Sequence, residues 1–260
     1  MKSVEDLLKR LAALHKRTAE TPLFNPVFQL SLEGGEPAQV TKAPVDVNAF
    51  ILSKDGKTLA FAAEVFPDCK EVDTLGCTEK RLAEQAKKKT SGKVYDQLLF
   101  RHWDTWKDGR RSHLFVQPVQ GGAAKDLMPK LAADAPVKPF GGSEQFAFSG
   151  DGKQLVFTAR DVGREEAWST DLDLFLVPTD GSAAPKKLTT TNRATDTNPS
   201  FSPDGKTLAY LAMARPGYEA DKLTVVLRSW PEGKERRLTE GWDRSPDGLQ
   251  WAADGKTLYA

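Results

Sequence analysis

Two adjacent glutamates, Glu165 and Glu166, are the carboxylates best placed in the sequence to bind a cation. They follow a predicted strand and lie in the loop after it. A buried or half-buried cation needs opposite charge and hydrogen-bond acceptors, and such a pair supplies both. Arg160 and Arg164 lie close by in sequence, so a solvated loop pair with weak ion pairs is the alternative.

A second group of candidate binding residues lies in the segment 101–106, which mixes charged and aromatic side chains just before a predicted strand. Arg101, His102 and Trp103 are its candidates, because arginine and tryptophan are common at recognition surfaces. The alternative is that the aromatic rings are buried between an insertion and its blade. Glu64 and Asp68 are further candidate carboxylates at the start of that insertion.

Catalytic and metal-binding residues are not expected. A serine hydrolase of the α/β type needs a Gly-x-Ser-x-Gly elbow, and the nearest segment, 141–145, lacks the closing glycine. The histidines are His15, His102 and His113, and no Ser–His–Asp set can be argued around them. His102 has no metal-binding partner at helical or loop spacing, so neither a metal nor another cofactor is predicted.

The two cysteines, Cys69 and Cys77, lie eight residues apart in a polar, turn-rich stretch. They form either a local disulfide or two unrelated free thiols. A disulfide across this loop would stabilise the fold by roughly 2.5 kcal/mol on the chain-entropy model and would indicate an oxidising compartment.

A repeat is the strongest structural signal. Four segments share an apolar stretch, an Asp-Gly turn and a second alternating stretch, with the turn aspartates at Asp55, Asp151, Asp204 and Asp254. Asp-Gly favours the tight turn of a β-hairpin. The last two separations, 53 and 50 residues, are close to the ~40–50 residues of a propeller repeat.

A second pattern lies between these hairpins and consists of a strand, a glycine turn and a short final strand. Together the two patterns give four strands, which is one blade of a β-propeller. We therefore predict an all-β chain of four-stranded antiparallel blades, with an incomplete propeller over 26–260. In chain order, its parts are a half blade (26–41), three blades (48–130, 144–190, 198–240) and a half blade (248–260).

The two half blades allow two interpretations of the propeller ring. They could pair and close a four-bladed ring, or further chain could be missing. Two helical segments are also predicted: an amphipathic helix over 1–20, and a helix within the insertion 67–96. Thr78 would cap the latter, Lys87 to Lys89 would be solvated near its end, and Ser91-Gly92 would stop it.

Composition argues against several classes of function. The net charge is +1, from 37 basic and 36 acidic residues, so we expect neither nucleic-acid nor membrane partners. No apolar run approaches the roughly 20 residues that span a bilayer. No signal peptide is expected in these residues.

The repeat resembles that of TolB-type propellers. Four other segments are similar to the dipeptidyl-peptidase branch of the prolyl oligopeptidase family, whose members join a propeller to an α/β-hydrolase domain. They are Glu64-Val-Phe-Pro-Asp-Cys69, Phe100-Arg-His-Trp-Asp-Thr-Trp106, Glu166-Ala-Trp-Ser-Thr170 and Trp242-Asp-Arg-Ser-Pro246.

The resemblance implies a periplasmic or secreted serine peptidase of which this chain carries only the propeller. The α/β-hydrolase domain would then be absent from these residues and would be the propeller's partner. Propeller carboxylates of this family hold the α-ammonium of short peptides, which implies that role for Glu165 or Glu166. Two functions follow as expectations: a gating, substrate-orienting propeller, or a TolB-like module that binds another protein.

Overall fold

The computed structural model describes residues 24–69, 73–96 and 98–260 and shows three complete blades flanked by two half blades. The helix predicted over 1–20 lies outside the described residues. Each complete blade is a four-stranded antiparallel sheet, so the predicted fold class is confirmed. Among the described residues, no helix has the length and apolar character needed to cross a membrane.

The strand bounds follow the predicted repeat closely. The first half blade pairs β1 (Phe28–Gln29) with β2 (Ala38–Gln39), and the last pairs β17 (Gln250–Trp251) with β18 (Leu258–Tyr259). The first complete blade contains β3 (Val47–Leu52), β4 (Thr58–Val65), β7 (Arg111–Pro118) and β8 (Lys125–Asp126). The second contains β9 (Phe146–Phe148), β10 (Gln154–Ala159), β11 (Asp173–Pro178) and β12 (Lys186–Lys187). The third contains β13 (Asp196–Phe201), β14 (Thr207–Ala212), β15 (Thr224–Ser229) and β16 (Glu235–Arg237).

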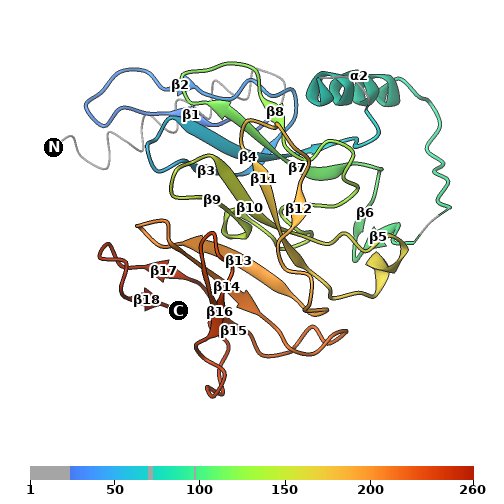
Figure 1. The fold of residues 1–260 in the computed structure, drawn as a ribbon. Helices are drawn as coiled ribbons and strands as arrows, with labels where there is room; N and C mark the ends of the chain where they lie inside the picture. Colours follow the sequence, from blue (N-terminus) through green and yellow to red (C-terminus); the bar gives the residue numbers. More distant parts are fainter. Residues whose placement is uncertain (1–23, 70–72, 97) are drawn as a thin grey trace.

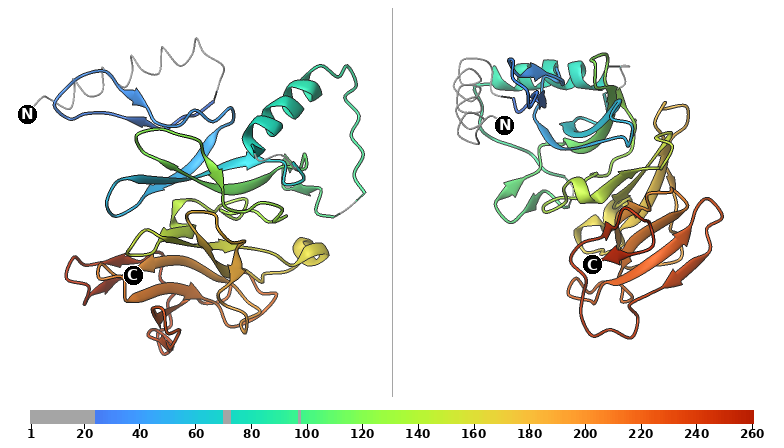
Figure 2. Two further views of the ribbon diagram at one scale, coloured as in Figure 1. Left: turned by 45° about the horizontal axis from the view of Figure 1, so that its top comes forward. Right: turned by 90° about the vertical axis from the view of Figure 1, so that its left-hand side faces the viewer.

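The blades follow one another along an open arc (Figures 1 and 2). The half blade β1–β2 lies at one end of the arc and β17–β18 at the other, so the two do not pair with each other. The first strands of successive blades contact one another: β9 contacts β13, and β13 contacts β17. The first strand of each of these blades is therefore the inner one.

Both faces of the central strands are apolar because every complete blade is packed between two neighbours. Along β4, Leu59 and Phe61 point toward the half blade β1–β2, whereas Ala60 and Ala62 point toward the second blade. This follows from the two-residue period of a strand. The Phe61 ring stacks on that of Phe115, with ring centroids 5.5 Å apart.

The geometry of the Asp-Gly turns explains why the same residue types recur at this position in each blade. In the first blade, the Asp55 carboxylate accepts hydrogen bonds from the Ser53 hydroxyl at 2.7 Å and the Lys57 backbone N–H at 3.1 Å. Both bonds lower the pKa of Asp55, and the bond from Ser53 has the larger effect. Gly56 adopts φ +68°, a left-handed conformation that glycine takes without a Cβ clash. The second and third blades repeat the arrangement.

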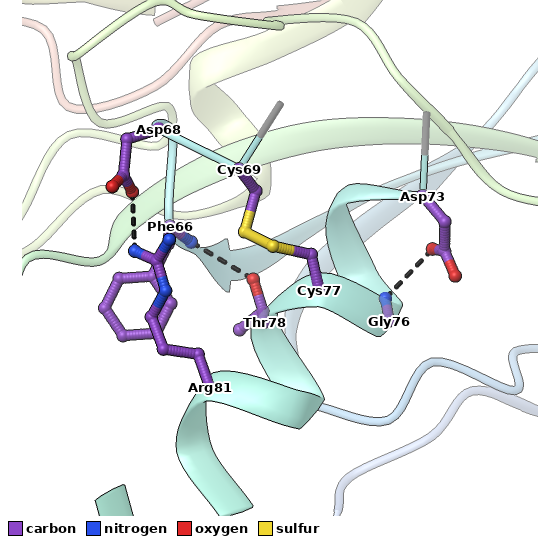
Figure 3. Close-up of a disulfide and its surroundings, with 8 residues drawn as sticks. All are labelled: Phe66, Asp68, Cys69, Asp73, Gly76, Cys77, Thr78 and Arg81. Carbon is purple, nitrogen blue, oxygen red and sulfur yellow. Dashed lines mark hydrogen bonds and ion pairs between the residues drawn. A yellow bond between two sulfur atoms is a disulfide. The ribbon is translucent and has the colours of Figure 1, made fainter. Parts of the chain in front are cut away.

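The insertion helix α2 (Thr74–Ala86) begins one turn earlier than expected. Its N-cap is Asp73, whose carboxylate accepts the backbone N–H of Gly76 at 2.9 Å. The prediction that Thr78 caps this helix is therefore wrong. The Thr78 side chain is buried, and its hydroxyl instead accepts the N–H of Phe66 at 3.1 Å, as Figure 3 shows. The helix ends at Ala86, ahead of the Ser91-Gly92 stop.

A disulfide joins Cys69 to Cys77, with Cα atoms 6.1 Å apart, and connects the end of β4 to the first turns of α2 (Figure 3). Beside it the Arg81 guanidinium lies over the Phe66 ring at 4.5 Å and pairs with Asp68 at 2.7 Å. These contacts fix α2 against the first blade.

Candidate functional site

The candidate site lies on one side of the arc, which we call the loop face. It carries the connections from the second to the third strand of each blade and the connections between blades. In an antiparallel blade these connections emerge at the same edge of the sheet. Helix α2, the hairpin of β5 (Arg101–His102) and β6 (Thr105–Trp106), and the 3₁₀ helix η2 (Gly163–Ala167) lie on this side, to the right in Figure 1.

A cavity of about 390 Å³ opens on the loop face between the first two blades. Three of the predicted candidates line it: Glu64 at the end of β4, His102 in β5 and Glu166 in η2. The lining includes four carboxylates and four lysine or arginine side chains, so the charges balance. The cavity therefore contains several charged groups and carries no net charge of its own.

Glu166 binds two cations of the first blade. Its Oε1 accepts Lys107 at 2.7 Å and Arg111 Nη1 at 2.6 Å, and its Oε2 accepts Arg111 Nη2 at 2.7 Å. The side chain is only 17% exposed. Although burial alone would raise the pKa of Glu166, the bonds from Arg111 and Lys107 outweigh it and lower the pKa to about 2. Glu166 is thus ionised at neutral pH and connects two blades.

The neighbouring ion pairs extend this network. Arg111 also donates to Asp134 at 2.8 Å, and the carboxylates around it keep its guanidinium charged. Glu64 pairs with Lys138 at 2.5 Å and with Arg110 at 3.4 Å. A carboxylate has about four acceptor positions. Within the described part of the chain Glu64 has two ion-pair partners and Glu166 accepts three hydrogen bonds, so both retain capacity for a ligand cation.

The two adjacent glutamates differ in their surroundings. Glu165 is exposed and lies outside the cavity lining, whereas Glu166 faces the first blade. Arg160 does not form the expected carboxylate pair with Glu166: its Nη1 donates to the Glu166 main-chain oxygen at 3.3 Å. The cations of Glu166 come instead from 55 and 59 residues earlier in the chain.

The aromatic rings of segment 101–106 lie at the edge of the cavity. Trp103 packs against His102 and Phe140, with centroids 5.2 and 5.1 Å apart. Trp103 is nevertheless 65% exposed and Trp106 52% exposed, so the expectation of buried rings is wrong for both. Arg101 lies over the Trp106 ring at 5.4 Å, outside the cavity.

Asp68 is drawn away from the cavity by its ion pair with Arg81. The sequence interpretation missed most of the cations that surround the glutamates, namely Lys107, Arg110, Arg111 and Lys138. The dense run of charge from Lys107 to Arg111, directly before a strand, was the available signal.

No protein-family model matches this chain. Several curated relatives do, among them the probable dipeptidyl-peptidase 5 of Arthroderma benhamiae and the dipeptidyl-peptidase 5 of Trichophyton schoenleinii. Each of these two is 34% identical over 188 residues, which cover 65% of this chain and 26% of the relative. The chain thus matches about a quarter of the length of these relatives.

Solved structures share the fold at low sequence identity. The acylaminoacyl peptidase of Pyrococcus horikoshii matches 86% of this chain and 30% of its own, with 11% identity and a TM-score of 0.56. Puromycin hydrolase matches 90% and 31%, with 17% identity and a TM-score of 0.51. These similarities confirm the predicted resemblance: in sequence the chain is similar to part of dipeptidyl-peptidase 5, and in fold it is similar to part of an acylaminoacyl peptidase.

Proposed function

We propose that this chain is the non-catalytic propeller portion of a serine-type dipeptidyl peptidase or oligopeptidase, where it gates access and orients short peptides by their free amino end. One observation carries the proposal: carboxylates from two blades, Glu64 and Glu166, line one cavity. The similarity to dipeptidyl-peptidase 5 supports it.

The chemistry of the cavity suits an ammonium group. A desolvated ammonium is costly unless it meets opposite charge and acceptors. Glu166 is ionised at neutral pH because its pKa is about 2, and among the residues that the structure describes its Oε2 accepts one hydrogen bond, from Arg111. A peptide ammonium at this oxygen and at Glu64 would complete the acceptor capacity of both groups.

In this proposal the α/β-hydrolase domain is the partner that supplies the nucleophile, and the propeller supplies selection and orientation. An oxidising compartment, the periplasm or the exterior, fits the Cys69–Cys77 disulfide. Positioning the amino end is worth a large rate factor in such enzymes, because a fixed orientation removes translational and rotational freedom before reaction.

The test is peptide binding to the 260-residue chain and its variants by calorimetry. Glu64→Gln and Glu166→Gln each keep shape and remove charge, and Glu165→Gln, at an exposed position, is the matched control. Truncating one partner of a buried charge pair costs about 2–5 kcal/mol, so we expect roughly 30-fold or greater loss of affinity for a free-amine tripeptide. Equal affinity of Glu64→Gln, Glu166→Gln and the control would contradict the proposal.

A further inference from the structure

A larger groove, of about 1010 Å³, adjoins the cavity on the loop face. The two hollows share a wall formed by Lys107, Asp108, Arg110, Arg160 and Glu166. The groove continues from this wall beneath the segment that follows α2, where Tyr95 and its neighbours line it. The cavity and the groove are therefore neighbours on the loop face.

The groove differs from the cavity in its charge. Seven lysine and arginine side chains and three carboxylates line it, a net charge of +4. Lys107, Arg110 and Arg111 are paired with carboxylates. The other four, Lys88, Lys93, Arg160 and Arg164, have no carboxylate partner within the described part of the chain, so the positive excess is available to a ligand.

Two residues that line this groove, Tyr95 and Arg160, each carry a buried polar atom that has no hydrogen-bond partner among the described residues: the Tyr95 hydroxyl and Arg160 Nε. Buried donors are normally satisfied, so both side chains retain capacity to donate to a ligand. A guanidinium and a phenol are both donors to a carboxylate, and the guanidinium binds it in a planar, charge-assisted geometry. The remaining Arg160 contact, to the Glu166 main chain, fixes the guanidinium beside the cavity.

We propose that this groove is a subsite for a carboxylate of the bound peptide, with Arg160 as its central donor and Arg164 and Lys93 as supporting charges. The inference rests on the proposed binding of the amino end in the adjoining cavity. The carboxylate belongs either to an acidic side chain or to the carboxyl end of a short peptide. An extended residue spans about 3.3–3.6 Å, so the ligand that we assign to the adjoining cavity and groove is a peptide of a few residues.

The experiment measures the affinity of the 260-residue chain for matched tripeptides. Gly-Ala-Glu amide and Gly-Ala-Gln amide differ only in the side-chain carboxylate, and Gly-Ala-Gln with a free carboxyl end tests the terminal source. N-acetyl forms of all three test the amino end separately. We expect at least one carboxylate form to bind about tenfold or more tightly than the uncharged amide.

Arg160→Gln should reduce this preference to less than threefold. Arg237→Gln, an exposed arginine on β16, is the matched control and should retain the full preference. If Arg160→Gln does not fold, Arg164→Gln replaces it in the test, because Arg164 is exposed and its substitution leaves the fold intact. Arg164→Gln should weaken the preference for the carboxylate.

Three results would overturn the inference. Peptides that require a free amino end but bind equally with and without a carboxylate would exclude the groove as a subsite and leave the amino-end proposal intact. Failure of every tripeptide to bind would contradict both. A carboxylate preference that persists in Arg160→Gln and Arg164→Gln would exclude these residues as its source.

Discussion

Glu166→Gln is the substitution whose energetic effect follows most directly from the structure. Its pKa falls from 4.5 to about 2 because Arg111 and Lys107 bind its ionised form. A difference of one pKa unit corresponds to about 1.36 kcal/mol, so the ion pairs contribute roughly 3 kcal/mol to the free energy of unfolding at neutral pH. Glutamine keeps the shape and one acceptor oxygen but leaves Arg111 without this charge.

The sign of the pH dependence also follows. Because the pKa of Glu166 is lowered in the folded chain, its stabilisation is complete above the unfolded pKa and is lost as the pH falls toward about 2. The difference between wild type and Glu166→Gln should therefore be about 3 kcal/mol at pH 7 and should shrink steadily below pH 4.5.

Urea unfolding followed by circular dichroism measures this difference, with Glu165→Gln as the control. Glu165 is exposed, and a screened surface charge is worth about 0–1 kcal/mol. If the two substitutions cost the same at pH 7, or if the cost of Glu166→Gln does not depend on pH, the reasoning about this ion-pair network is wrong.

Three further predictions concern the fold. Gly205→Ala should lower the melting temperature more than Gly56→Ala: both glycines have positive φ, but only at Gly205 would a Cβ meet the backbone of the neighbouring turn, at 3.1 Å. Equal shifts would contradict that contact. Reducing the Cys69–Cys77 disulfide should destabilise the chain by about 2.5 kcal/mol, measured by unfolding with and without reductant; an unchanged midpoint would refute this. Burial raises the pKa of Asp196 to about 6, so its charged form opposes folding as the pH rises through that value. Asp196→Asn should therefore stabilise the folded chain by about 3 kcal/mol at pH 8 and hardly at all at pH 4. Equal shifts of the melting temperature at the two pH values would contradict this prediction.

The propeller could be predicted from sequence because its signals are local. The Asp-Gly turn and the alternating apolar residues around it are neighbours in the chain, and their spacing repeats with each blade. The helix start was wrong because Asp73 and Thr78 are both acceptable caps. The packing of Thr78 against Phe66, which decides between them, is a tertiary contact.

The candidate site was less predictable for a related reason. Sequence placed Glu166 in a loop, but its partners Arg111 and Lys107 belong to another blade and meet it only after the blades pack. The nearer arginine, Arg160, does not neutralise it. Charge pairing across blades depends on register and blade geometry, which residue types alone do not determine.

The central claim is that the loop-face cavity binds the free amino end of a short peptide. Calorimetric titration of the 260-residue chain with one tripeptide amide and its N-acetyl form at pH 7 tests it most directly. The account predicts that the free amine binds at least tenfold more tightly. Equal affinity of the two forms would contradict it.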